Sequence, residues 1–183
     1  MRVFLDACVL FPPLVRSLVL GSADQGLFVP LWSARVLEEW RRAVAAKQGG
    51  EAEHLVHLAQ AEMRTRHPAS LCAADPDLEA GVDLPDPADA HVLAAALAGG
   101  AEVLLTFNLK DFPRRTLAGH GIEARHPDGY LWELLSGHER VMFEAVEMCL
   151  RNAEIDVSRG RAALKRARLS RIGKAWEALL HAS

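Results

Sequence analysis

Residues 86–113 read DPADAHVLAAALAGGAEVLLTFNLKDFP, and this stretch contains a helix start, a helix end and a strand in that order. Asp86 can cap the helix, and Pro87 suits its first position because the first helical turn leaves its N–H groups unused. The apolar run that follows ends at a double glycine, a common end for a helix. The segment EVLLT, residues 102–106, then predicts a buried strand. This order is typical of the repeating unit of a parallel α/β sheet.

The rest of the chain repeats this alternation. Further strands are expected at residues 2–5, 27–31, 69–74 and 121–124, and further helices at residues 14–24, 33–46 and 51–66. Residues 75–87, which are dense in proline and aspartate, are expected to form a loop. Pro30 favours an edge or an end of the sheet for its strand. The alternation predicts an α/β fold, a three-layer α/β/α sandwich whose parallel sheet has four to five strands.

From Pro127 onward the pattern is helical. Helices are expected over residues 129–135, 138–154 and 158–181. We therefore expect two parts, a domain at residues 1–126 and a C-terminal helical extension at residues 127–183, packed on or beside it. Residues 157–175 carry seven basic residues and no acidic one, a pattern that favours a solvated helix face over a phosphate-binding track.

Charge and cysteine content argue against several classes of protein. The net charge of −3 disfavours a purely electrostatic nucleic-acid binder. The three cysteines are widely spaced, which is typical of neither a disulfide framework nor a zinc site and favours the reducing cytoplasm. No apolar run approaches the ~20 residues of a membrane span, and the first strand starts at Arg2, so we expect neither a membrane segment nor a signal peptide.

Two aspartates lie where α/β folds place their sites. Asp6 directly follows the strand at residues 2–5, at a carboxyl end where ligands bind in such sheets, although it could equally cap the next segment. Asp89 is more specific, because the apolar residues of its helix fall within roughly 80° of it on a helical wheel. A carboxylate on a buried face carries a desolvation cost unless something pairs it, and a metal ion would do so.

Three further polar residues extend this set. Glu39 lies at the border of the apolar stripe of its helix, whereas Glu38 points to water. Asn108 and Asp111 follow the strand EVLLT, again at a carboxyl end, although both residue types are also common in turns. His91 points away from the apolar stripe of its helix and is expected at the surface.

Four carboxylates gathered at one sheet edge would repel one another unless a cation held them. An all-oxygen group without clustered histidine or cysteine ligands suits Mg²⁺ or Mn²⁺ better than Zn²⁺. The residues therefore predict a magnesium or manganese site.

The same segments resemble the motifs of the PIN-domain nucleases, in particular the toxin branch of bacterial toxin–antitoxin pairs, over about residues 1–126. RVFLDACVL (residues 2–10) is similar to the first family motif, SARVLEEW (residues 33–40) to the second, and residues 86–113 to the third and fourth together. The resemblance implies catalytic roles for Asp6, Glu39, Asp89 and Asp111, and metal binding by Asp6, Asp89 and Asp111. It places Thr106 and Asn108 beside them as residues that position ligands or phosphate.

Two residues depart from the family pattern. Cys8 stands where the family often has asparagine, and a thiol is a poorer hydrogen-bond partner for Asp6. Asn108 stands where many relatives have aspartate, which removes one negative charge from the expected metal site.

The resemblance implies a PIN-like fold and a Mg²⁺- or Mn²⁺-dependent endoribonuclease that cleaves single-stranded RNA. It further implies the toxin of a type II toxin–antitoxin pair, with a cognate antitoxin protein as partner, a homodimer as a possible assembly and no membrane association. Two alternatives stay open at this point. One is an RNA-processing or DNA nuclease outside a toxin–antitoxin pair, and the other is a PIN-like interaction module with weak or no catalysis.

Overall fold

The structure is a computed structural model that describes residues 1–73 and 75–182. It divides into two compact units, and each is described by itself. The sheet unit comprises Met1–Phe11 and Phe28–Arg125, and the helical unit comprises Pro12–Leu27 and His126–Ser183. Two predicted segments end at residues outside the described ones, the strand at Ala74 and the C-terminal extension at Ser183. The domain boundary expected after residue 126 stays a prediction, and residues 12–27 are grouped with the C-terminal helices.

The sheet unit contains a five-stranded parallel sheet, as the alternation of strands and helices predicts. Its strands are β1 (Arg2–Leu5), β2 (Val29–Ser33), β3 (Leu71–Cys72), β4 (Val103–Leu105) and β5 (Glu123–Arg125). They lie in the order β3-β2-β1-β4-β5, so the chain builds outward from β1 on one side and then returns to build on the other. Val3, Phe4 and Leu5 of β1 are fully buried at the centre of the sheet.

Pro30 lies in β2, which pairs with a strand on each side, so β2 is not an edge strand. The N–H of Trp32 donates to the carbonyl of Ser70 on the β3 side. The nitrogen of Pro30, two residues earlier, faces that same side. β3 pairs only with Trp32 and Ser33, so no ladder hydrogen bond is lost at the proline.

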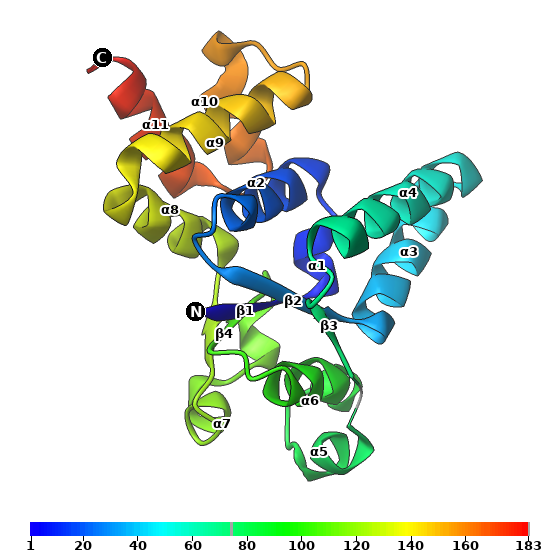
Figure 1. The fold of residues 1–183 in the computed structure, drawn as a ribbon. Coiled ribbons are helices and arrows are strands. Elements are labelled where there is room, and N and C mark those ends of the chain that lie inside the picture. Colours follow the sequence, from blue (N-terminus) through cyan, green and yellow to red (C-terminus); the bar gives the residue numbers. More distant parts are fainter. Residues whose placement is uncertain (74, 183) are drawn as a thin grey trace. The chain divides into compact units, whose positions relative to one another are not determined.

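Helices cover both faces of the sheet and complete the predicted three layers. Figure 1 shows α1, α3 and α4 on one face and α5, α6 and α7 on the other. Their bounds are α1 (Ala7–Leu10), α3 (Ala34–Gln48), α4 (Gly50–Arg66), α5 (Pro76–Gly81), α6 (Ala90–Ala98) and α7 (Arg114–Ala118). The expected loop at residues 75–87 therefore contains a helix, and the carboxylate of Asp75 caps it by accepting from the N–H groups of Asp77 and Leu78.

Helix α6 follows a short 3₁₀ turn, η1 (Pro87–Asp89), and is buried on nearly all sides. It packs on β2 and β3, and α5 also packs against it. His91 is consequently only 5% exposed, so the expected surface position of this histidine is wrong. The wheel argument assumes that one side of the helix faces water, and α6 has no such side over residues 90–96.

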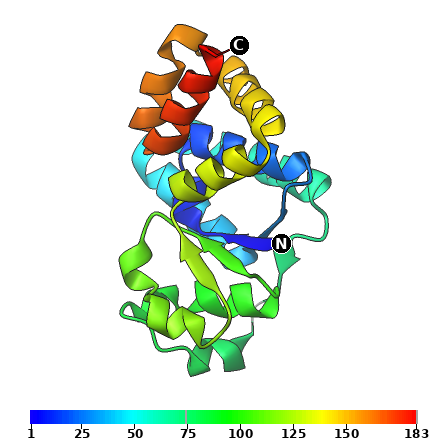
Figure 2. The same cartoon turned by 90° about the vertical axis from the view of Figure 1, so that its left-hand side faces the viewer.

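Within its described residues, the helical unit contains five helices, which Figure 2 shows beside one another. These are α2 (Pro13–Asp24), α8 (Pro127–Gly137), α9 (Glu139–Asn152), α10 (Val157–Arg166) and α11 (Ser170–Leu180). The single helix expected at residues 158–181 is therefore two helices, and the chain turns at Arg168, where φ is 63°. Asp128 explains the break, because its buried carboxylate accepts from the N–H groups of Arg171 and Ile172 and so caps α11.

Among the helices described, none has both the length and the apolar character that crossing a lipid bilayer demands.

Candidate functional site

The strand order places β1 beside β4, where the direction of sheet building reverses. In open α/β sheets, ligands bind outside the carboxyl ends of the strands at such a point. Asp6 follows β1, and Thr106 follows β4, so both lie at this position. The backbone N–H of Asp6 donates to the carbonyl of Leu105 (3.1 Å), which joins the two strand ends.

The carboxylate of Asp6 is held by side chains rather than used as a helix cap. It makes no capping hydrogen bond to α1, so the alternative role considered for this residue is not the one found. The hydroxyl of Thr106 donates to Oδ2 of Asp6 at 2.7 Å, and the thiol of Cys8 donates to the same oxygen at 3.0 Å. The N–H of Asn108 in turn donates to Oγ1 of Thr106 at 2.9 Å. This network fixes the orientation of Asp6.

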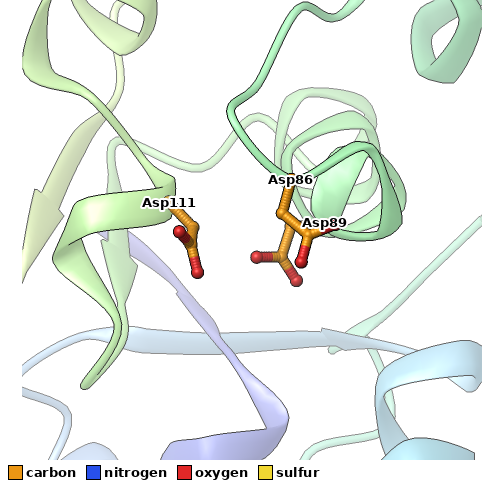
Figure 3. Close-up of side chains that lie close together, drawn as sticks. All are labelled: Asp86, Asp89 and Asp111. Carbon is orange, nitrogen blue, oxygen red and sulfur yellow. The ribbon is translucent and has the colours of Figure 1, made fainter.

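Three further carboxylates converge beside this point, namely those of Asp86, Asp89 and Asp111, and we call them the acid cluster. One oxygen from each lies within 4.8 Å of the other two. Figure 3 shows Asp86 and Asp89 facing Asp111 across a shared space. Asp89 ends η1, and Asp111 ends a second 3₁₀ turn, η2 (Leu109–Asp111). The segments that precede and follow β4 in the chain therefore both contribute carboxylates to the acid cluster.

Burial and nearby negative charge both act on the carboxyl of Asp89. Burial raises the pKa of this carboxyl to about 6, and the negative charges of Asp6, Asp86 and Asp111 add to the rise. A cation among these groups would offset both the burial and the repulsion. Asp6 itself is not one of the three carboxylates that lie within 4.8 Å of one another, but its negative charge acts on Asp89.

Asp86 belongs to the acid cluster, although its sequence position predicted only a helix cap. The cap is present, because Oδ1 accepts from the N–H of Ala88 at 2.9 Å. The carboxylate serves both purposes, since it also lies beside Asp89 and Asp111. The three-residue spacing between Asp86 and Asp89 was the available signal, because residues three apart share one side of a helical turn.

Asn108 contacts the acid cluster through Asp111. Its side-chain amide donates to Oδ2 of Asp111. An aspartate at position 108 would place a second negative charge at this contact, whereas the amide supplies a donor. The side chain of Asn108 therefore orients the carboxylate of Asp111.

Glu39 and Glu38 differ in their partners rather than in their exposure, which is 38% and 36% for the two side chains. Glu38 is therefore not simply pointing to water. It is paired with Arg41 and Arg42, and these hydrogen bonds lower the pKa of its carboxyl to about 2. Glu39 instead lies 2.8 Å from the imidazole Nε2 of His91 and 3.6 Å from Nε of Arg35.

The donor set fits a hard divalent cation. The acid cluster and Asp6 offer carboxylate oxygens alone, the ligands that Mg²⁺ and Mn²⁺ prefer. No cysteine sulfur or histidine nitrogen belongs to the group within the described part of the chain, so it is not a zinc-type site.

The basic residues of the helical unit lie at its surface. All seven bases of residues 157–175 are exposed, and Arg161 is paired with Glu177. The guanidinium of Arg171 lies over the ring of Trp132, at 4.3 Å from its centroid.

Comparison with known proteins gives a family and one curated relative. The family model described as "PIN domain" matches residues 2–110. A protein of Mycobacterium tuberculosis named "Putative ribonuclease VapC50" is 44% identical over 68 residues, which make up 37% of this chain and 40% of the relative. The chain thus matches well under half of that relative's length. No solved structure matches the chain.

Proposed function

The chain belongs to the PIN-domain family, and from this premise we propose that it is a divalent-metal-dependent endoribonuclease that cleaves single-stranded RNA. The observation that carries the proposal is the convergence of the carboxylates of Asp86, Asp89 and Asp111, with Asp6 acting electrostatically on Asp89 from the end of β1. The name of the mycobacterial relative supports ribonuclease activity.

In this proposal Asp6, Asp89 and Asp111 hold the metal ion, Mg²⁺ or Mn²⁺, and Asp86 adds a fourth carboxylate. When bound, the ion would acidify a water molecule and offset the charge that builds on the scissile phosphate. Hydrogen bonds from Thr106 and Cys8 to Oδ2 fix the orientation of the Asp6 carboxylate, and the amide of Asn108 does the same for Asp111. Glu39, which lies 2.8 Å from His91, is proposed as the remaining catalytic carboxylate.

The proposed biological role is the toxin of a type II toxin–antitoxin pair, with an antitoxin protein as its partner. Motif similarity to the toxin branch of the family supports this role, and a homodimer stays a prediction. The proposed compartment is the cytoplasm, which suits three free cysteines.

The test is cleavage of a fluorescently labelled single-stranded RNA with Mg²⁺, with Mn²⁺ and with EDTA. We expect cleavage with either metal, loss of cleavage in EDTA, and little cleavage of DNA of the same sequence. Full turnover in EDTA would exclude the metal mechanism. The absence of cleavage with both metals would favour the non-catalytic interaction module.

A further inference from the structure

His91 is a buried polar residue on a helix of small apolar ones. It is 5% exposed, and its neighbours Ala90, Val92 and Leu93 are buried with it. Burying an imidazole is costly unless its nitrogens find partners. An apolar residue would suit this position better if packing were its only purpose.

One contact accounts for the histidine at this position. Nε2 of His91 lies 2.8 Å from Oε1 of Glu39, on helix α3. A carboxylate can only accept a hydrogen bond, so in this close contact Nε2 is the side that can supply a proton and Glu39 the side that can receive it. Nδ1 is buried and has no hydrogen-bond partner among the described residues. Among the described residues, Glu39 is thus the side chain that His91 contacts, and His91 also acts electrostatically on Asp89, whose pKa it lowers.

The second partner of Glu39 is weaker. Nε of Arg35 lies 3.6 Å away, the side chain of Arg35 is 52% exposed, and its Nη1 is 2.9 Å from Glu79. An exposed ion pair at this distance contributes little. The 2.8 Å contact with buried His91 is thus the one that restrains the Glu39 carboxylate.

His91 also follows Asp89 by two residues at the start of α6. The same helix start therefore carries one carboxylate of the acid cluster and the donor that holds Glu39. We propose that His91 is a positioning residue that holds the carboxylate of Glu39 in place relative to Asp89 of the acid cluster, an inference that rests on the proposed nuclease function. Residues that orient metal-site side chains in this way typically contribute about 10- to 100-fold to affinity or activity.

The test compares His91→Leu, which fills the space without a donor, with His91→Gln, whose amide keeps a donor near the position of Nε2. We expect His91→Leu to lower kcat for single-stranded RNA by about 10- to 100-fold with little change in KM. His91→Gln should restore most of the rate. The two variants should unfold at similar temperatures. A difference in kcat between them would then reflect the contact with Glu39, because a merely structural role for His91 would not separate their rates.

A double-mutant cycle identifies Glu39 as the residue through which His91 acts. His91→Leu should have no further effect on kcat or on Mn²⁺ affinity in a Glu39→Ala background. It should keep its full effect in a Glu38→Ala background, which is the matched control. Equal rates for His91→Leu and His91→Gln, or an undiminished effect of His91→Leu in Glu39→Ala, would overturn the proposal.

The cycle also separates this inference from the proposed function. A wild-type chain that neither cleaves RNA nor binds Mn²⁺ would refute the nuclease proposal. The same variants would then be compared by their free energies of unfolding in urea. Coupling between His91→Leu and Glu39→Ala would uphold the contact without its catalytic role, and no coupling would refute the contact as well.

Discussion

The thiol of Cys8 donates a hydrogen bond to Oδ2 of Asp6 (3.0 Å), while its sulfur accepts the N–H of Phe107 at 3.2 Å. Cysteine thus fills the place where the PIN family often has asparagine, and it still links the end of β1 to the residues after β4. Burial raises the pKa of this thiol to about 12, and the negative charge of Asp6 adds to the rise. The protonated form that donates to Asp6 is therefore the stable one.

The first prediction is that Cys8 resists thiol reagents in the native protein. With a pKa of about 12, only about one molecule in ten thousand carries the reactive thiolate at pH 8. Cys72 and Cys149 are buried and their thiol pKa values are also raised. Ellman's reagent should detect almost no thiol in the native chain and all three after unfolding in guanidinium chloride. Rapid native labelling that disappears in Cys8→Ser would contradict this account.

The second prediction concerns the stability of the metal-free protein against pH. Asp89 has a pKa of about 6 when folded, above the 3.8 of an unperturbed aspartate. The folded state therefore holds the Asp89 proton more tightly, so its contribution to stability is full below pH 3.8 and is lost as the pH rises through 6. Asp89→Asn removes this loss.

Urea unfolding in EDTA between about pH 4 and pH 7 measures this effect as the difference between wild type and Asp89→Asn. The unfolding free energy of wild type should fall relative to the variant across this range. Added Mg²⁺ should reverse the fall, because it binds the folded state. If the difference in unfolding free energy between wild type and Asp89→Asn does not change with pH, the pKa of Asp89 is not raised in the folded state.

The third prediction concerns the packing of the helical unit. A Cβ at Gly160 would lie 2.7 Å from both Leu150 and the fully buried ring of Trp176. Gly160→Ala should therefore lower the free energy of unfolding by about 1–3 kcal/mol. Gly21→Ala is the control, because nothing lies within 4 Å of that position inside α2. The control should be stabilising by about 0.5–1 kcal/mol, and equal effects of the two changes would refute the packing argument.

Strand ends could be located from the sequence because they depend on local patterns. The apolar runs before Asp6 and Thr106 are β1 and β4, and both residues lie at the site. His91 could not be placed, because its burial depends on how α5 and the sheet enclose α6. A wheel describes one helix and carries no information about its neighbours. The contact with Glu39 depends on that same tertiary arrangement.

The break between α10 and α11 was missed for a similar reason. Residues 166–170 contain neither glycine nor proline, so nothing in the local sequence ends the helix there. The cap comes from Asp128, more than 40 residues earlier, whose carboxylate binds the N–H groups of Arg171 and Ile172. A remote side chain can stop a helix in this way without leaving a local signal.

The most direct test of the central claim is the rate of Mg²⁺-dependent cleavage of single-stranded RNA by Asp89→Asn. This change removes one negative charge from the acid cluster and keeps the size of the side chain. The control is Asp83→Asn, since Asp83 is an exposed carboxylate in the same segment but outside the acid cluster. We predict that Asp83→Asn cleaves like wild type and that Asp89→Asn, although folded, loses more than about 100-fold in rate. Cleavage by Asp89→Asn at the wild-type rate would contradict the account.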